Sequence, residues 1–356
     1  MEWIGASSIW VPPGYTWENL TQYKDLRFPD ARDLLIYPIA IAFVQFILKY
    51  AVLTPYVYIS LSKHFGIISE GVSQRYQPNE KLEQLFQKYG HSVPEKIAQS
   101  AAVSLGLTER QLERWFRHRV KDVRNTVTKK FADCAWQLSY YSASCLLGIF
   151  VLYDKPWFYD VRRCWDQFPL QSVSTGVWCY YMFALGFYCL ETLTHFSHPK
   201  RTDHAQLLVH HICALLLLSC TWISNTTRLG TLTILLFECN DIPLLLAKLF
   251  GYCGFYSMKD LFFVIFVFIW ISTRIIIFPL FIMREALVET YFNAGAYFHI
   301  YYIVIVLLFV ILAMNLMWTY SIFHVIIKRL NSDKVSDVRS SDEELTDDEN
   351  ERKKKR

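Results

Sequence analysis

Long apolar runs alternate with shorter polar segments along most of the chain, and this pattern predicts membrane-spanning helices. Seven runs have about the 17–25 residues that a helix needs to cross a bilayer. They cover residues 34–53, 134–152, 177–196, 207–223, 229–250, 261–283 and 298–327. The first run is expected to end before Pro55, and Pro243 is expected to break the helix of the fifth run. The pattern therefore predicts an all-α, polytopic membrane protein with about seven transmembrane helices.

Polar segments flank these runs. Residues 1–33 are polar and contain prolines, which is not the pattern of a signal peptide. Residues 79–130 are typical of a small helical unit whose last helix begins with Thr108 as N-cap and Gln111 at the capping-box position. The apolar face of that helix would consist of Leu112, Trp115 and Phe116. Residues 331–356 mix Ser, Asp and Glu without apolar periodicity, which predicts a disordered tail.

Composition supports a membrane protein and excludes several other classes. Of 356 residues, 53% are hydrophobic and only 19% are charged, whereas a soluble domain carries about 25% charged residues. A disordered chain, a collagen-like chain and an ordinary cytosolic enzyme are therefore excluded. The net charge of +4 is too small to indicate a nucleic-acid partner. The nine cysteines lack zinc-site spacing, and a bond between Cys164 and Cys179 is left open.

The distribution of Lys and Arg predicts the orientation in the membrane. Residues 54–130, the loop 198–203 and the C-terminal tail are rich in these residues, which places them in the cytosol and the N-terminus in the lumen. Asn19 lies in a lumenal N-x-T sequon and is the expected glycosylation site. Ser340 and Ser341 precede three acidic residues, a context that favours phosphorylation, although a purely solvating tail explains the same composition.

Ionisable residues inside the membrane are the candidates for chemistry, because they are costly there. His210 and His211 lie in the fourth run, and Glu238 and Asp241 share one face of the fifth. A short link joins the two helices, so we expect antiparallel neighbours with both clusters at similar depth. A histidine beside a carboxylate provides a base and the group that orients it, which suits acyl transfer.

Other interpretations of these residues remain open at this point. The four groups could pair only to satisfy one another between helices. A metal site is disfavoured because the two histidines point about 100° apart on a helix and the HExxH spacing is missing. A transporter would predict internal repeats and broken helices at the midplane, and we find no repeat.

The stretch LLVHHICALLLLSCTWISNTTRLGTLTILLFECNDIPLLLAK resembles the Lag motif of the TLC-domain ceramide synthases. The segments DKPWFYDVRRCW and TRIIIFPL also match that family, and LERWFRHRV resembles its truncated homeobox-like domain. The resemblance covers nearly the whole chain. It implies a lumenal segment 1–33, a first transmembrane helix 34–53, a homeobox-like cytosolic segment 70–130, a TLC membrane domain 131–328 and a cytosolic tail 329–356.

The resemblance implies an acyltransferase of the endoplasmic reticulum membrane. Such an enzyme joins the acyl group of a fatty acyl-CoA, its co-substrate, to the amine of a sphingoid base and yields (dihydro)ceramide. The implied partners are these two substrates, membrane lipid, and a second ceramide synthase in a homo- or heterodimer. No bound cofactor or metal is implied. DNA binding is not expected, because His118 occupies the position where a homeodomain has its adenine-reading Asn.

The resemblance also maps site residues onto this chain, with departures. The catalytic pair corresponds to His210 and His211, and the downstream acid to Asp241. The family usually has His-Asp where this chain has Phe237 and Glu238, and a Glu where it has Leu245. Either Glu238 replaces the missing Asp and the enzyme works, or the protein is a lipid-binding or heterodimerising regulator. The CoA head group is expected near Lys200, Arg201 and Lys248.

Overall fold

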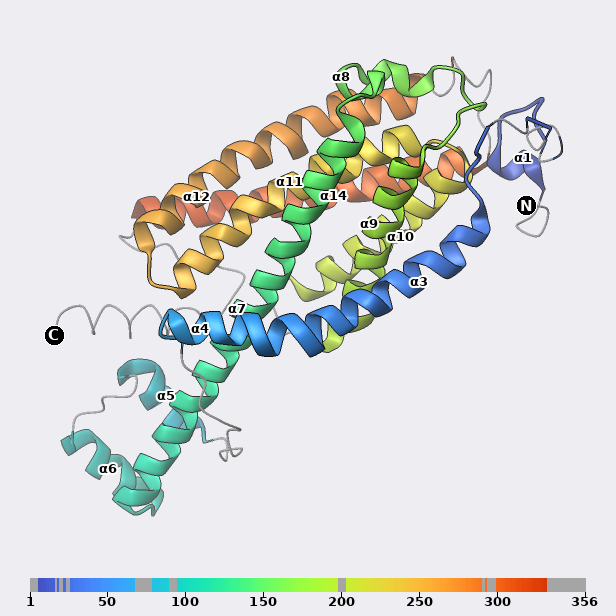
Figure 1. Ribbon diagram of the computed structural model, residues 1–356. Coiled ribbons are helices and arrows are strands. Elements are labelled where there is room, and N and C mark those ends of the chain that lie inside the picture. Colours follow the sequence, from blue (N-terminus) through green and yellow to red (C-terminus); the bar gives the residue numbers. More distant parts are fainter. Residues whose placement is uncertain are drawn as a thin grey trace.

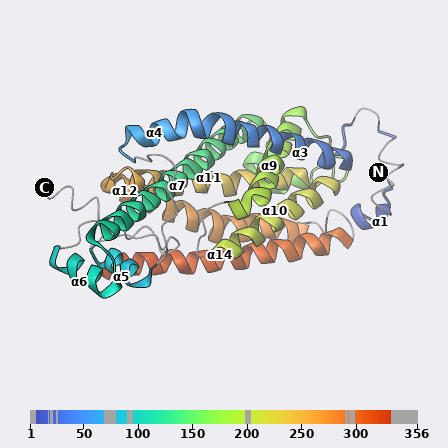
Figure 2. The ribbon, with the colours of Figure 1, turned by 90° about the horizontal axis from the view of Figure 1, so that it is seen from below.

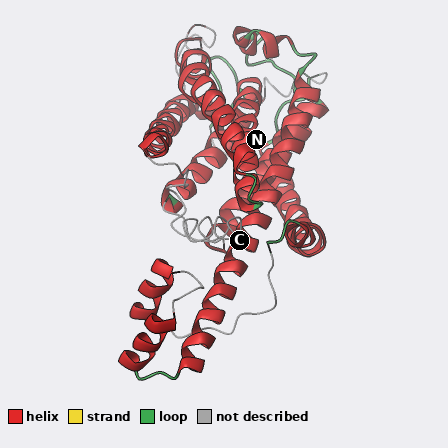
Figure 3. Cartoon of the chain, turned by 90° about the vertical axis from the view of Figure 1, so that its left-hand side faces the viewer, coloured by secondary structure: helices red, strands yellow, loops and turns green. Residues whose placement is uncertain are grey.

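The computed structural model describes residues 6–16, 18, 22–23, 26–67, 79–89, 95–197, 203–289, 292 and 299–331. Within these residues every regular element is a helix and no strand occurs (Figure 3). The all-α prediction is confirmed. Along the chain the helices are α1 (Ser7–Trp10), α3 (Ala31–Ile47), η2 (Leu48–Tyr58), α4 (Ile59–His64), α5 (Glu80–Tyr89), α6 (Glu95–Leu105), α7 (Glu109–Leu152), α8 (Pro156–Tyr159), η3 (Val161–Trp165), α9 (Thr175–Thr194), η4 (His195–Ser197), α10 (His204–Ile223), α11 (Thr227–Tyr252), α12 (Tyr256–Trp270), η5 (Ile271–Met283), η6 (Glu285–Glu289) and α14 (His299–Asn331).

Six helical segments in the described chain are long and apolar enough to cross a membrane. They cover residues 31–64, 126–152, 204–223, 227–252, 256–288 and 299–327. The remaining predicted run, 177–196, forms α9, which has 20 residues but carries tyrosines, threonines and glycines. Most of α9 is buried among other helices. Because few of its side chains contact lipid, the helix tolerates polar residues such as tyrosine and threonine.

The first membrane helix is longer than predicted. α3, η2 and α4 follow one another without a break from Ala31 to His64 (Figure 1), past the predicted end at residue 53. Pro55 lies inside η2, a π-helical stretch, and such local changes of helical geometry accommodate a residue without an N–H. The expectation that Pro243 breaks α11 is wrong, since α11 is a continuous α-helix around it.

A small helical unit stands apart from the bundle at the start of α7 (Figure 1). α5, α6 and the first turns of α7 enclose an apolar core that includes Leu82, Phe86, Leu112, Trp115 and Phe116. The predicted capping box is confirmed: Gln111 N–H donates to the Thr108 hydroxyl, and Thr108 N–H donates to the Gln111 side chain. The helix that begins there does not end at the membrane, because α7 runs on for 44 residues and crosses the bundle.

Within the bundle, α3 and α14 lie on opposite sides and α9, α10 and α11 lie between them (Figure 2). α9 packs closely on α3, since a Cβ added to Gly186 would lie 2.5 Å from Ile41 Cγ2. Tyr181 of α9 reaches between α10 and α11: its hydroxyl donates to the Leu218 carbonyl, and a Cβ on Gly230 would lie 2.6 Å from the Tyr181 hydroxyl. α9 therefore forms the centre around which the polar residues of α10 and α11 gather.

Candidate active site

The two histidines of α10 face different neighbours. Their ring centroids are 6.0 Å apart, and adjacent residues on a helix point about 100° apart. His211 is buried and its ring lies 6.2 Å from Tyr188 of α9. The His210 ring contacts Trp318 of α14 edge to face, at 5.3 Å. α10 thus directs one imidazole toward α9 and the other toward α14.

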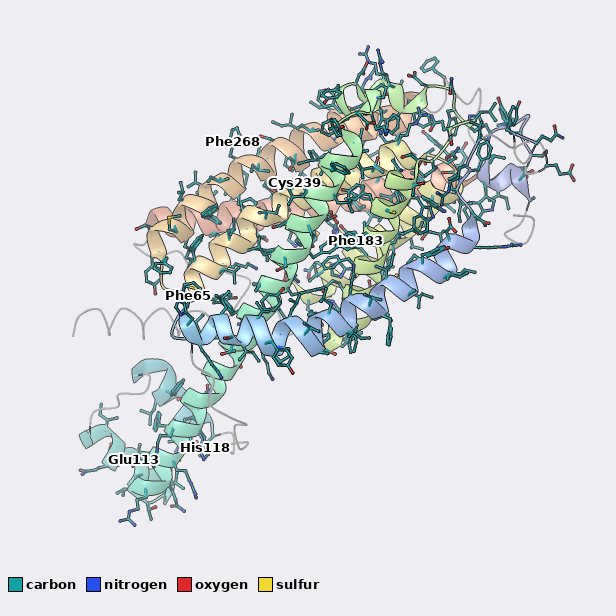
Figure 4. All side chains as sticks on the ribbon, in the orientation of Figure 1. Phe65, Glu113, His118, Phe183, Cys239 and Phe268 are labelled. Carbon is teal, nitrogen blue, oxygen red and sulfur yellow. The ribbon has the colours of Figure 1, made fainter. Side chains whose placement is uncertain are left out.

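Glu238 is fully buried and joins α11 to α7. Tyr140 donates a hydrogen bond of 2.8 Å to one carboxylate oxygen, and Ser144 donates to the other. Sequence reasoning missed Tyr140 and Ser144, although their spacing of four residues puts both on one face of α7. The neighbouring residue Cys239 lies within the bundle (Figure 4), with its sulfur 2.9 Å from that of Cys145. These contacts fix the position of the Glu238 carboxylate.

Asp241 lies next to the buried guanidinium of Arg274, which comes from η5. The Asp241 Oδ2 atom is 3.7 Å from an Arg274 nitrogen. Arg274 also donates a hydrogen bond of 3.1 Å to the Phe237 carbonyl, and its guanidinium carbon lies 3.9 Å from the centre of the Phe237 ring and 5.1 Å from that of Trp270. Arg274 therefore pairs with a neighbouring helix, as expected for a cation inside the membrane.

Tyr188 and Arg274 link the histidine cluster to the acid cluster. The Tyr188 ring contacts His211, and the charges of Glu238, Asp241 and Arg274 influence its hydroxyl. The charge of Arg274 also influences His210. That the histidines and the carboxylates reach a similar depth in the membrane stays a prediction. α9, α10, α11 and η5 together surround one polar region inside an otherwise apolar bundle.

Two buried amide side chains lie on α11 and α14, close in sequence to residues of this region. Asn240 on α11 and Asn315 on α14 are fully buried, and among the described residues neither amide oxygen nor amide nitrogen has a hydrogen-bond partner. Asn315 lies one turn before Trp318, the residue that contacts His210. Leaving a buried amide unpaired costs about 1–3 kcal/mol per group. Such groups are explained where a polar ligand supplies the missing bonds.

The remaining predicted site residues are less informative. Lys248 is partly exposed and lies on α11, two turns beyond Asp241. Lys200, Arg201, Asn19, Ser340 and Ser341 lie outside the described residues. In the part of the chain that the structure describes, no group of three or more His, Cys, Asp and Glu side chains is arranged to hold a metal ion.

The cysteine pair left open by the sequence is not bonded in the structure. Cys164 and Cys179 are both free thiols, the first buried in η3 and the second exposed on α9. Burial raises the pKa of the Cys164 thiol above its ordinary value, because the thiolate loses its hydration. Cys164 is therefore expected to stay protonated and unreactive.

Comparison with known proteins identifies the family. A model of the TLC domain matches residues 130–324. Human ceramide synthase 3 is 31% identical over 343 residues, which cover 96% of this chain and 88% of the relative. The chain belongs to the ceramide synthase family. Human ceramide synthase 5 is 31% identical over 351 residues, with 96% and 88% of the two chains covered. Human ceramide synthase 4 is 29% identical over 345 residues, with 96% and 86% covered.

Membership of the ceramide synthase family directs attention to the two departures in the motif. Phe237 is buried, and its ring packs 4.9 Å from Phe278 while the Arg274 guanidinium covers it. Leu245, one turn after Asp241, is also buried. Both side chains are buried, so the polar residues left between positions 237 and 245 are Glu238, Asn240 and Asp241.

Proposed function

We propose that this protein is an N-acyltransferase of the endoplasmic reticulum membrane. It joins the acyl group of a fatty acyl-CoA to the amine of a sphingoid base and releases (dihydro)ceramide and CoA. The observation that supports this proposal is the position of Tyr188, whose ring contacts His211 and whose hydroxyl is influenced by the charges of Glu238 and Asp241. The buried amides of Asn240 and Asn315 have no hydrogen-bond partner among the described residues. Such amides suit the binding of the polar groups at which the acyl chain and the sphingoid base are joined.

The chemistry requires a neutral amine and a thioester carbonyl held against it. The amine nitrogen attacks the carbonyl carbon, the C–N bond forms, and the C–S bond breaks to release the thiol of CoA. One histidine of the pair takes the proton of the amine, or first accepts the acyl group as a nucleophile. Exclusion of water from the bundle protects the thioester against hydrolysis. The acid groups near the pair stabilise the imidazolium that forms.

The membrane orientation belongs to the same proposal. The N-terminus faces the lumen and the C-terminus the cytosol, so the CoA head group stays at the cytosolic end of α10 and α11, near Lys200, Arg201 and Lys248. Lys248 lies at that end of α11. A multiply anionic head group is attracted by clustered Lys and Arg side chains.

A second function is favoured by the contacts of α11. Both oxygens of Glu238 accept hydrogen bonds from α7, and Phe237 is part of the apolar packing. The Glu238 carboxylate therefore holds α11 and α7 together. A regulatory protein without catalytic activity would also need this structural role. In this alternative the protein binds lipid, or pairs with an active ceramide synthase, and its polar region no longer supports catalysis.

The experiment measures dihydroceramide formation in microsomes from cells that lack their own ceramide synthases. Sphinganine and a panel of acyl-CoA chain lengths are supplied. We expect product from the wild-type protein and none from His210→Ala or His211→Ala. The matched control is His324→Ala, because His324 is exposed near the end of α14, and this variant should keep full activity. A correctly localised wild-type protein that forms no product with any chain length overturns the catalytic proposal and leaves the regulator.

A further inference from the structure

A row of three imidazoles leads from the candidate active site to the end of the bundle. The ring of His195, which follows α9 directly, lies 6.3 Å from that of His211. The same ring stacks on His204 at a centroid distance of 3.9 Å. His195 is 2% exposed, whereas His204, the first residue of α10, is only partly buried. The row therefore begins at a buried histidine of the proposed site and ends where water has access.

We propose that His195 and His204 form a proton relay between His211 and the aqueous phase at the end of the bundle where α9 ends and α10 begins. This inference rests on the proposed acyltransferase function. His195 and His204 act through His211 and do not touch the reacting atoms, so they are positioning residues for the proton.

The reaction creates the need for such a relay. A sphingoid base enters as an ammonium ion, and thioester and ammonium together yield an amide, a thiol and one proton. That proton leaves a region closed to bulk water, where a retained charge would be costly. Imidazole is suited to this task because it accepts a proton on one nitrogen and gives one up from the other. Each step moves one proton to the next ring, and no other reactant is needed.

The distances are suitable for transfer through short hydrogen-bonded steps. The centroid distance of 6.3 Å between His211 and His195 is too long for a direct hydrogen bond, so this step requires one bridging water, and bridging waters of this kind are common in active sites. The rings of His195 and His204 are stacked, with an angle of 29° between their planes, so their N–H bonds do not point at each other. Proton transfer between them therefore requires rotation of one ring about its side-chain bond, or one further water. His204 then releases the proton to solvent.

The surroundings of His195 favour a transient positive charge. His195 is the C-cap of α9, and the C-terminus of a helix attracts cations. Glu191 lies four residues earlier on the same helix, and its carboxylate is 3.6 Å from Lys49 Nζ. Lys49 in turn is 3.3 Å from Asp133. A carboxylate one helical turn away, such as that of Glu191, favours a positive charge on the His195 ring.

The test compares His195→Gln and His204→Gln with the wild-type enzyme at saturating sphinganine and acyl-CoA. Glutamine keeps a polar side chain but cannot pass a proton. We expect kcat to fall about 10- to 100-fold in His195→Gln, with KM for both substrates unchanged within a factor of two. His204→Gln, at the partly exposed end, should lose less. Imidazole added to the buffer should restore much of the lost kcat, because a small base can replace the missing ring.

Several outcomes separate the relay from a structural role and from failure of the proposed function. The control His324→Gln should neither lose activity nor respond to imidazole. A loss of activity in both relay variants without imidazole rescue, or with a raised KM, indicates disturbed packing and overturns the relay. Full kcat in both variants overturns it as well. A wild-type protein without activity overturns the proposed function and the relay together, whereas an active wild type with unaffected variants removes the relay alone.

Discussion

Replacement of Glu238 by aspartate tests how this site is held together. The family resemblance makes Asp the usual residue here, so sequence alone suggests that Glu238→Asp is tolerated. The structure predicts the opposite. Both carboxylate oxygens of the buried Glu238 accept hydrogen bonds from α7, one from Tyr140 at 2.8 Å and one from Ser144. An aspartate carboxylate ends about 1.5 Å nearer the backbone, too far to keep both bonds within hydrogen-bond distance.

The expected loss of stability follows from these contacts. Each lost hydrogen bond to a buried group costs roughly 1–3 kcal/mol, and the missing methylene adds about 0.8 kcal/mol. If the shorter side chain keeps one of the two bonds, the free energy of unfolding should fall by roughly 2–4 kcal/mol. Equilibrium unfolding in mixed micelles, followed by the fluorescence of the 11 tryptophans, measures this change.

A double-mutant cycle shows whether the hydrogen bonds are the cause. In the Ser144→Ala background one of the two bonds is already absent, so Glu238→Asp should cost less there than in the wild type, by about 1 kcal/mol or more. Cys145→Ser serves as a control, because Cys145 is adjacent on α7 but contacts Cys239 instead. A Glu238→Asp variant as stable as the wild type, or equal costs in the two backgrounds, would refute the reasoning.

Two further predictions concern helix packing. Lys49→Met should lower the free energy of unfolding by about 3–5 kcal/mol, because Lys49 is 1% exposed and its ammonium group pairs with the carboxylates of Asp133 and Glu191. Glu191→Gln added to this variant should recover part of the loss. Gly230→Ala should lower the free energy of unfolding by about 1–3 kcal/mol, since the new Cβ would lie 2.6 Å from the Tyr181 hydroxyl. Adding Tyr181→Phe to this variant should remove the clash and recover part of the loss. Both are measured by unfolding in mixed micelles.

These two predictions fail in recognisable ways. If Lys49→Met unfolds like the wild type, the ion pairs of Lys49 with α7 and α9 do not stabilise the packing of the first membrane helix. If Gly230→Ala is neutral, or if Tyr181→Phe makes it worse, the close approach of α9 and α11 is not what requires a glycine at that position.

The sequence determined the class of the molecule and the residues worth examining. Apolar runs of membrane-spanning length predict helices because a bilayer leaves no water for unpaired backbone groups, and this rule needs no knowledge of neighbours. The capping box at Thr108 was equally predictable, since Thr108 and Gln111 satisfy each other's backbone donors locally. His210, His211, Glu238 and Asp241 could be selected from the cost of placing such side chains in lipid.

The tertiary structure decided what each of these side chains contacts. Whether a proline ends a helix depends on the geometry around it, and so the first membrane helix and α11 continue where sequence predicted an end. Glu238 is held by α7, nearly a hundred residues away in the chain. The row from His211 through His195 to His204 exists only because the end of α9 and the start of α10 are brought together. Local sequence patterns report the environment that a residue needs, whereas the partner that supplies it is fixed by packing between distant helices.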